Sequence, residues 1–275
     1  MGNTGRKSAG GGMALTGGGI TAPVQPNVTI TPANQGNPQV AAQTPNDQNT
    51  PVTPQALTNI SQMSDDELAA LVLASKKAVM PNFLADRPDP TQKFVFQAGL
   101  NEKPMVLDQA EFQQFMQDNG IKQGEVLSRS VNGASYTNQQ GYAVNYSAAD
   151  VLDVLKYSKL NYIGGKHGGQ AYGAGAYFAM TGGSSTGYGG TTANAVLNPN
   201  TARIISDSAL ANKAQAFAQS HPKFASAVGR FSNSTMSIYA LAMGYNVITD
   251  HSGGARPKSG DYYNIIDRSA LVYLK

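Results

Sequence analysis

Residues 169–188 read GQAYGAGAYFAMTGGSSTGY and combine six glycines with three tyrosines, Tyr172, Tyr177 and Tyr188. The pattern predicts a glycine-rich turn, a short strand over residues 176–180 and a second turn that ends at Tyr188. Glycine lets the backbone approach a ligand closely, and tyrosine rings offer stacking faces. The segment therefore indicates either a site for a planar ligand or a tight β-hairpin filled with tyrosine, and the spacing alone favours neither.

Glycine-rich loops also bind phosphates, but the two common nucleotide-binding patterns do not occur in the required context. Neither G-x-G-x-x-G nor G-x-x-x-x-G-K-[ST] opens a predicted helix in this chain. The run YGAGAYFA, residues 172–179, leads into a strand instead. A dinucleotide-binding Rossmann turn and a P-loop are therefore both excluded.

The composition narrows the class of protein further. A net charge of +3 without any block of Lys or Arg gives no strong nucleic-acid signal. The lack of cysteine excludes a disulfide scaffold, and the three histidines are far apart in the sequence, so we expect no metal site. No apolar run reaches the roughly 18 residues that cross a bilayer. The stretch GGGMALTGGG does not resemble a secretion signal, and we expect neither a membrane partner nor secretion.

The order of patterns predicts three regions. Residues 1–55 are rich in Gly, Pro, Gln, Asn and Thr and are predicted to be a disordered tail. Residues 56–120 are predicted to be helical, with capping boxes in residues 64–67 and 108–111. Residues 121–275 mix short strands with separate helices and lack regular β-α-β alternation. This mixture predicts an α+β domain whose helices surround split β-sheets.

Several elements of the α+β domain can be expected individually. EVLSRSV, residues 125–131, predicts a strand in which Arg129 shares a face with Leu127 and Val131. Ser147 predicts the start of a helix. Arg268 is interpreted as facing solvent or a carboxylate of its own turn. Further strands are predicted at residues 194–197, 202–205, 246–249, 262–266 and 270–274, and further helices at residues 208–220, 222–229 and 234–244.

The tyrosine segment resembles a known one. YGAGAYFA…SSTGYG is similar to the nicotinamide-binding segment of the ADP-ribosyltransferase superfamily, in the poly-ADP-ribosyltransferase form F-G-x-G-I-Y-F-A…S-x-x-Y. In that form a Ser and a Tyr follow the central Tyr by eight and eleven residues, which places Ser185 and Tyr188 after Tyr177. The resemblance implies that Tyr177 and Tyr188 enclose the nicotinamide ring of NAD and that Ser185 binds its carboxamide.

Other segments resemble the same superfamily in the expected order, over residues 92–275. EVLSRSV is similar to the first core strand, L-Y-R-G-[VT], whose Arg holds the phosphates and ribose of the dinucleotide, and Arg129 takes that place. YALAMGYNVITD…DYYNIIDRSALVYL and GLNEKPMVLDQAEFQQF resemble segments of phage-encoded members. The resemblance implies an ADP-ribosyltransferase-like domain at residues 121–275. The cofactor-binding residues that it implies are Arg129, Ser130, Gly175, Tyr177, Phe178, Ser185 and Tyr188.

The chain departs from the superfamily at the catalytic carboxylate. In the superfamily a Glu at the start of a late strand hydrogen-bonds a ribose hydroxyl and stabilises the oxocarbenium-like transition state. The matching residues 261–264 read DYYN and contain no Glu. Either Tyr262 or Tyr263 takes its place, and Asp261 is one methylene shorter. The candidate catalytic residues are therefore Asp261 and Tyr263, and the loss of the Glu would slow catalysis by several orders of magnitude.

These observations leave hypotheses of different classes. In the first, the chain is an ADP-ribosyltransferase or NAD glycohydrolase that uses NAD as substrate and acts on a host protein or another acceptor. In the second, it is a catalytically inactive relative that serves as a virion or assembly component, docked by the tail and by residues 64–119. A third is a tyrosine-lined module that binds carbohydrate or peptide. The first two imply a location in the host cytoplasm or in the virion.

Overall fold

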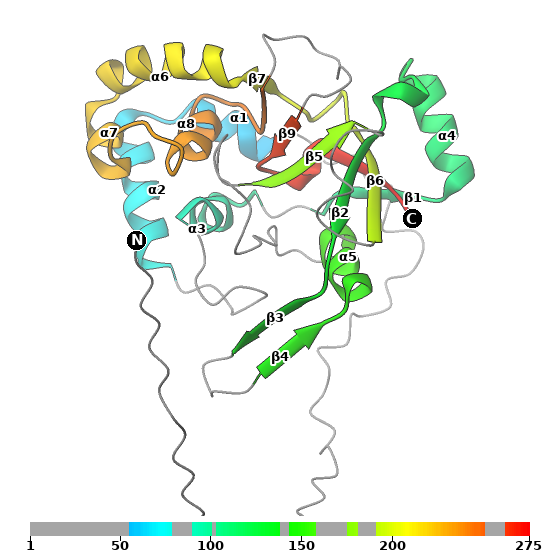
Figure 1. Cartoon of the computed structure of the whole chain (residues 1–275). Helices are drawn as coiled ribbons and strands as arrows, with labels where there is room; N and C mark the ends of the chain where they lie inside the picture. The colour runs from blue at the N-terminus through cyan, green and yellow to red at the C-terminus, as the bar shows by residue number, and fades with distance from the viewer. Residues whose placement is uncertain are drawn as a thin grey trace, which may run out of the picture. The chain divides into compact units, whose positions relative to one another are not determined.

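The structure is a computed structural model of the 275-residue chain (Figure 1). All described residues belong to one compact unit, Pro45–Lys275. The predicted tail lies outside the described residues, apart from Gln55, which begins the first helix. The structure describes residues 55–78, 90–100, 103–137, 143–157, 175–180, 191–250 and 262–275.

The described residues combine helices with a mixed β-sheet, so the predicted α+β class is confirmed. The helices are α1 (Gln55–Ser61), α2 (Asp65–Lys77), α3 (Pro90–Gln97), α4 (Gln109–Asp118), α5 (Ala148–Tyr157), α6 (Asp207–Ser220), α7 (Pro222–Val228) and α8 (Met236–Ala242), with 3-10 turns η2 (Gln123–Glu125) and η4 (Arg268–Ala270). The strands are β1 (Met105–Leu107), β2 (Leu127–Val131), β3 (Ala134–Thr137), β4 (Ala143–Tyr146), β5 (Ala176–Met180), β6 (Thr191–Leu197), β7 (Ile204–Ser206), β8 (Val247–Thr249), β9 (Tyr262–Ile265) and β10 (Leu271–Leu274).

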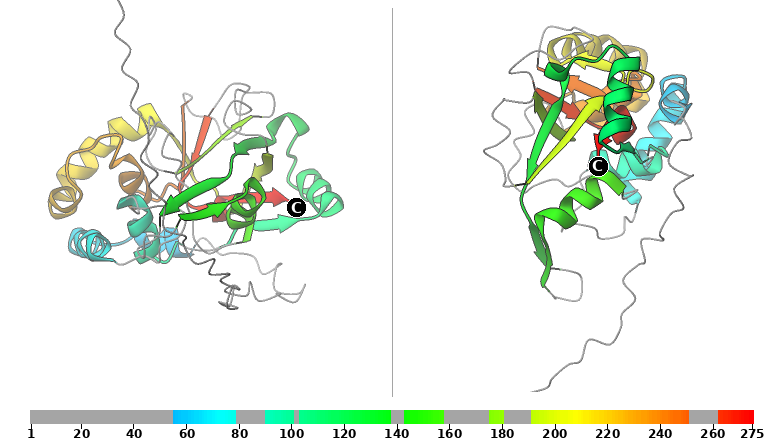
Figure 2. Two further views of the ribbon diagram at one scale, coloured as in Figure 1. Left: turned by 60° about the horizontal axis from the view of Figure 1, so that its bottom comes forward. Right: turned by 90° about the vertical axis from the view of Figure 1, so that its right-hand side faces the viewer.

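The strands divide unequally between two sheets. Eight of them form one sheet in the order β1-β10-β6-β2-β5-β9-β8-β7, and β3 pairs with β4 in a separate hairpin. Two of the sheet's pairings, β1 with β10 and β7 with β8, are parallel, and the others are antiparallel. The hairpin, which the sequence did not predict, projects beyond the end of β2 (Figures 1 and 2).

Local hydrogen bonds explain where several helices begin. The Ser64 hydroxyl accepts from the backbone N–H of Glu67, and the Glu67 carboxylate accepts from the N–H of Ser64. Asp108 is the reciprocal cap of α4, and the Ser147 hydroxyl accepts from the N–H of Asp150 at the start of α5. These side chains satisfy N–H groups that have no partner inside the helix. Both predicted capping boxes and the predicted start at Ser147 are confirmed.

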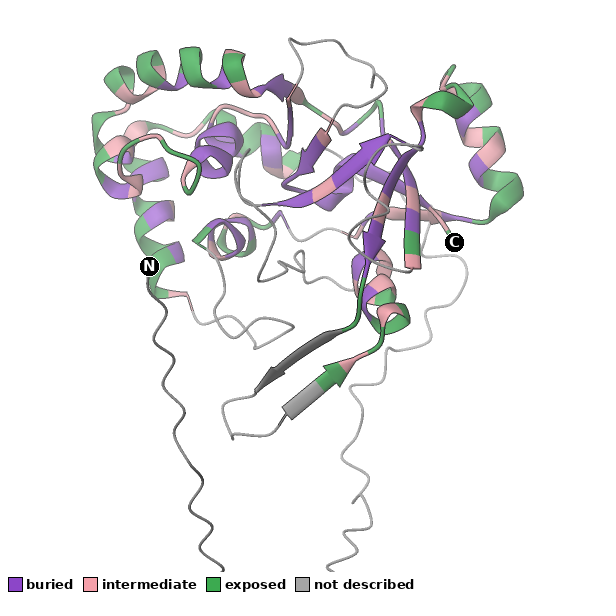
Figure 3. Ribbon diagram, viewed as in Figure 1, coloured by how far each residue is buried: buried purple, intermediate pink, exposed green. Residues whose placement is uncertain are grey.

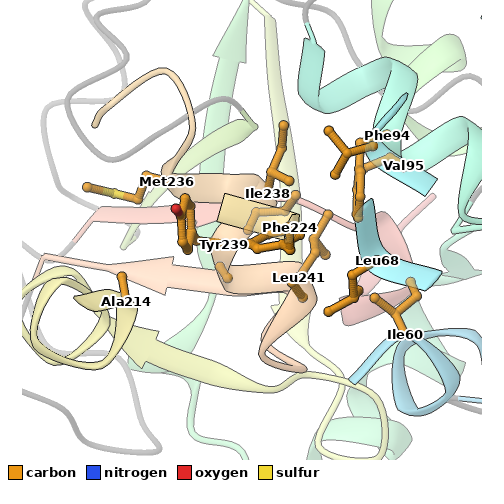
Figure 4. Packing of buried hydrophobic residues seen from close by; sticks show 14 of the residues in the cluster. Ile60, Leu68, Phe94, Val95, Ala214, Phe224, Met236, Ile238, Tyr239 and Leu241 are labelled. Carbon is orange, nitrogen blue, oxygen red and sulfur yellow. The ribbon is translucent and has the colours of Figure 1, made fainter. Parts of the chain in front are cut away.

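The N-terminal and C-terminal helices share one hydrophobic core. Helix α8 is buried along its whole length (Figure 3), and its side chains pack with those of α1, α2, α3, α6 and α7 (Figure 4). Burial of this much aliphatic and aromatic surface is the main stabilising contribution to such a layer. The predicted helical region 56–120 is therefore continuous with the domain core. The residues labelled in Figure 4 are Ile60, Leu68, Phe94, Val95, Ala214, Phe224, Met236, Ile238, Tyr239 and Leu241.

Polar contacts at both ends hold α2 parallel to α7. The Asp65 carboxylate accepts from the backbone N–H groups of Lys223 and Phe224, at 3.0 and 2.7 Å, which caps the start of α7. Lys76 in the last turn of α2 donates to the carbonyl of Ala227 near the end of α7. Desolvation raises the pKa of Asp65, but the hydrogen bonds from α7 outweigh it and leave the pKa below its ordinary value. The negative Asp65 lies at the start of α7, where the helix dipole is positive, and the positive Lys76 lies near its end, where the dipole is negative. Both contacts are therefore favourable.

The large sheet opens between β2 and β5. Strand β2 pairs with β6 along its whole length, from Leu127 to Val131, and β5 pairs with β9 from Ala176 to Ala179. Between β2 and β5, however, pairing is limited to Leu127 with Met180 and Ser128 with Ala179. Figure 1 shows the two strands diverging from that end. The middle of the sheet is therefore held together at one end only.

Candidate functional site

Three of the segments that carry the resemblance lie on neighbouring strands. Arg129 is on β2, Tyr177 is on β5, and β9 directly follows Asp261, in the spatial order β2-β5-β9. Asp261, Ser185 and Tyr188 themselves lie outside the described residues. The residues that can be placed therefore belong to one part of the sheet although they are far apart in the sequence.

One face of these strands belongs to a hydrophobic core. Phe178 on β5 pairs with Tyr263 on β9, and both side chains are fully buried. The Phe178 ring also meets the Tyr273 ring edge-on, with the centroids 6.1 Å apart. Cofactor binding was predicted for Phe178 and catalysis for Tyr263, but the structure places both in the core. The buried members of this cluster are Leu127, Ala176, Phe178, Met180, Ala193, Ala195, Val247, Tyr263, Ile265, Ala270, Leu271 and Tyr273.

The opposite face of the same strands carries uncharged polar side chains. Side chains alternate along a strand, and directly paired residues share a face. Tyr177 pairs with Asn264, Ala179 pairs with Tyr262 and with Ser128, and Ser128 also pairs with Asn194. Two hydroxyls of this face, those of Ser130 and Thr192, lie 3.4 Å apart. We name this set the polar stripe, and it consists of Ser128, Ser130, Tyr177, Thr192, Asn194, Tyr262 and Asn264.

Helices cover this face on both sides of the polar stripe. Ile248, the partner of Asn264 on β8, belongs to the helical core described above. On the other side Val196, two residues after Asn194 on β6, packs in a cluster that includes Phe112 and Met116 of α4. Helix α5 packs on the reverse face, where its side chains contact Val131. The polar stripe therefore occupies the middle of the sheet, between two helix-covered flanks.

Arg129 reaches across the point where the sheet opens. It pairs with Ala193 of the core face, so its side chain shares that face with Leu127, as the alternation predicted. Its guanidinium Nη1 donates to the backbone carbonyl of Tyr177 at 3.4 Å. The structure thus brings Arg129 to the backbone of Tyr177, while the two side chains leave the sheet on opposite faces.

Gly175 makes room for the side chain of Asn264. A Cβ atom at position 175 would lie 1.8 Å from Asn264 Oδ1 and 2.8 Å from the carbonyl oxygen of Ile265. Close approach of the backbone to a ligand was expected here, but the described neighbour that approaches is the amide of Asn264. Gly175 therefore positions a residue of the polar stripe, and the sequence did not indicate a site role for Asn264.

The substitution Gly175→Ala is expected to lower the free energy of unfolding by about 1–3 kcal/mol, because the added methyl group overpacks a buried contact. Urea denaturation measures the change. Gly124→Ala is the matched control, since nothing lies within 4 Å of a Cβ atom at that position. We expect the control to stay within about 0.5 kcal/mol of the wild type. Equal stability of the two variants would contradict the contact between Gly175 and Asn264.

A buried charged turn lies next to this region and was not predicted. Arg268 is only 1% exposed, and its Nη1 donates to the carbonyls of Val154 and Leu155, at 2.9 and 2.6 Å, in the last turn of α5. The neighbouring Asp267 is also buried and accepts from the N–H and hydroxyl of Ser269. Of the two interpretations of Arg268, a position facing solvent is therefore wrong, whereas the charge of the turn carboxyl Asp267 does act on Arg268. The Asp-x-Ser pattern of the turn was visible in the sequence, but nothing in the sequence indicated the helix end that Arg268 contacts.

Burial shifts the pKa values in this turn. Desolvation raises the pKa of Asp267 to about 6, although the hydrogen bonds from Ser269 and the charge of Arg268 oppose the shift. Desolvation also lowers the pKa of Arg268 to about 10. The buried hydroxyl of Tyr273 has its pKa raised to about 12 by desolvation, against the charges of Arg268 and Arg129. All three shifts disfavour the charged form, as expected for groups removed from water.

The described histidine His221 has a structural role. His221 stacks on the Phe217 ring, with the centroids 4.0 Å apart, and its Nδ1 lies 2.9 Å from the hydroxyl of Ser220. Within the described parts of the chain, no group of three or more His, Asp or Glu side chains could hold a metal ion. In the same parts, no helix has the length and apolar character that a bilayer crossing requires.

Comparisons with known proteins supply no relative from which a function could be transferred. No protein-family model, no curated protein and no solved structure matches this chain.

Proposed function

We propose that this chain is an ADP-ribosyltransferase-like protein that binds NAD at the centre of the large sheet. The observation that carries the proposal is the adjacency of β2, β5 and β9, which bear three of the segments that resemble the superfamily. These segments come from sequence positions more than a hundred residues apart, between Arg129 and Tyr262. An NAD site of the implied kind requires them side by side.

The chemistry of the polar stripe suits the nicotinamide nucleoside half of NAD. Tyr177 and Tyr262 are partly exposed and offer ring faces for stacking. The hydroxyl and amide side chains beside them match the ribose hydroxyls and the carboxamide, which are neutral hydrogen-bonding groups. The Arg129 side chain leaves the sheet on the opposite face, but its guanidinium reaches the Tyr177 carbonyl where β2 and β5 are no longer paired, and we assign the phosphates to it at this opening.

The proposal takes two forms that differ at the carboxylate. In the catalytic form Asp261 stabilises the transition state, and ADP-ribose passes to a host protein or another acceptor. In the second form the chain keeps the NAD site without catalysis and serves as a virion or assembly component. The second form is favoured by the pairing of Tyr177 with Asn264, because an amide stands on the ligand side of β9.

Calorimetric titration with NAD tests the binding. We expect Arg129→Ala to weaken NAD binding by roughly tenfold or more, the usual effect of losing a charge-assisted hydrogen bond. Arg203→Ala is the matched control, because Arg203 is exposed and donates to the backbone carbonyls of Asn200 and Ala202 close to it in the chain. The proposal fails if the wild type shows no NAD binding, or if both variants bind as the wild type does.

Incubation with labelled NAD and host lysate separates the two forms. In the catalytic form the wild type transfers label or releases nicotinamide, and Asp261→Ala abolishes this while it still binds NAD. In the second form neither protein transfers label, and both bind NAD with equal affinity. The two outcomes exclude each other, so the measurement selects one form.

A further inference from the structure

Asn264 occupies a position on β9 that the sequence could not distinguish from its neighbours. Residues 261–264 contain an acid, two tyrosines and an amide, and each of them was near the expected place of a catalytic carboxylate. The pairing register separates them. Tyr263 pairs with Phe178 and lies in the core, whereas Asn264 pairs with Tyr177 and shares its face.

The side chain of Asn264 is buried and packs closely against Gly175. The side chain is only 1% exposed, and its Oδ1 fills the space that a Cβ atom at Gly175 would otherwise occupy. Tyr262 is the other member of the polar stripe on β9. Its backbone N–H donates to Asp250 Oδ1, and its backbone carbonyl accepts from the N–H of Asp250. The buried amide of Asn264, packed against Gly175, is an uncharged hydrogen-bonding group.

We propose that Asn264 is the residue of β9 that contacts the ligand beside Tyr177, and that it acts as a neutral partner of a ribose hydroxyl. This inference rests on the proposed NAD site and adds which residue sets its chemistry. An amide binds a hydroxyl without adding negative charge. It therefore holds the nucleoside in place but gives no electrostatic stabilisation to a cation that develops at the anomeric carbon.

The reaction that this amide leaves unassisted is hydrolysis of the glycosidic bond. The bond between ribose C1 and the pyridinium nitrogen breaks, and its electron pair leaves with nicotinamide, which becomes neutral. Water supplies the oxygen that bonds to C1, and its proton passes to the solvent. The products are ADP-ribose, nicotinamide and a proton. A carboxylate at position 264 would face the positive charge on the ribose ring, because it replaces an amide of the same shape.

The test uses the full chain with Asn264→Asp and Asn264→Ala. Asn264→Asp is expected to release nicotinamide roughly 10²-fold faster than the wild type at pH 8, the size of one preorganised electrostatic contact. Asn264→Ala is expected to bind NAD roughly tenfold more weakly, because one hydrogen bond is lost. Nicotinamide release is followed by chromatography, and NAD binding by calorimetry. Thermal unfolding with and without NAD shows that each variant is folded.

Asn198→Asp is the matched control, because Asn198 is also a buried amide but lies outside the polar stripe, directly after β6, and its Oδ1 accepts from the Asn200 N–H as a carboxylate oxygen also can. A faster release in this control equal to that in Asn264→Asp would overturn the assignment of Asn264. If Asn264→Ala binds NAD as tightly as the wild type does, the assignment of Asn264 is also overturned. This binding measurement still decides the question if Asn264→Asp does not fold. If the wild type itself does not bind NAD, the proposed function falls and this inference falls with it. If the wild type binds NAD but the Asn264 variants do not give the expected changes, only the role of Asn264 is refuted.

Discussion

Replacing Arg268 with Met is expected to lower the free energy of unfolding by about 3–5 kcal/mol, the usual effect of leaving a buried charge uncompensated. Two losses combine in this variant. The carbonyls of Val154 and Leu155 at the end of α5 lose their donor, and Asp267 keeps its buried carboxyl without the neighbouring cation. Urea denaturation followed by circular dichroism measures the change.

Arg203→Met is the matched control for this prediction. Its guanidinium also donates to two backbone carbonyls, those of Asn200 and Ala202, but the side chain is exposed. Water replaces an exposed donor at little cost, so we expect a loss below about 1 kcal/mol. The double variant Asp267→Asn/Arg268→Met is expected to be more stable than Arg268→Met alone, because it leaves no unpaired buried charge. Equal losses in the two single arginine variants would contradict the burial of Arg268.

The substitution Asp267→Asn is expected to remove a pH dependence of stability between about pH 4 and pH 6. The pKa of Asp267 is about 6 in the folded protein and about 3.9 for an unfolded Asp. In this window the folded protein therefore binds more protons than the unfolded chain, so stability falls as the pH rises. The shift corresponds to about 2–3 kcal/mol, which the wild type loses between pH 4 and pH 6 relative to Asp267→Asn.

The difference between the two unfolding curves, measured in urea at half-unit steps of pH, isolates this contribution. Other carboxyl groups have a lowered pKa, so they make the stability rise with pH, and they do so at a lower pH than Asp267. Backbone and side-chain hydrogen bonds from Ser64 lower the pKa of Glu67, and hydrogen bonds from Ser147 lower that of Asp150. Glu67 and Asp150 stabilise the fold fully above the pKa values near 4 of the unfolded chain. This stabilisation is lost as the pH falls through their lower pKa values in the folded protein. These groups are present in both proteins and cancel in the difference. A difference that does not change with pH would contradict the raised pKa of Asp267.

Elements that depend on near neighbours in the sequence could be predicted well. The caps at Ser64 and Asp108 satisfy N–H groups within three residues, and a capping box requires no distant partner. The strand with Arg129 followed from period-two alternation over EVLSRSV, and its face agrees with the pairing. The hairpin of β3 and β4 was missed, because its sequence has neither a strong turn signal nor a clean alternation.

The candidate site could be predicted only in part. Arg129 and Tyr177 were identified from motif segments, and the structure brings them to neighbouring strands. Phe178 and Gly175 were identified from the same segment, but Phe178 packs in the core and Gly175 adjoins Asn264. A motif match assigns residues to a segment, whereas the contact that each side chain makes depends on the strand beside it.

By itself the sequence determined the α+β class, the helix starts and the strands that carry the motif segments, because each follows from residues close together in the chain. Only the tertiary structure determined which face of β9 meets the core. In DYYN every residue is polar or amphipathic, so alternation leaves two registers open, and the pairing of β9 with β5 selects the one that buries Tyr263 and turns Asn264 toward Tyr177. The same holds for Arg268, whose burial depends on the end of α5, more than a hundred residues earlier in the chain. Side chains that are ambiguous in the sequence are thus placed by partners that the chain brings together on folding.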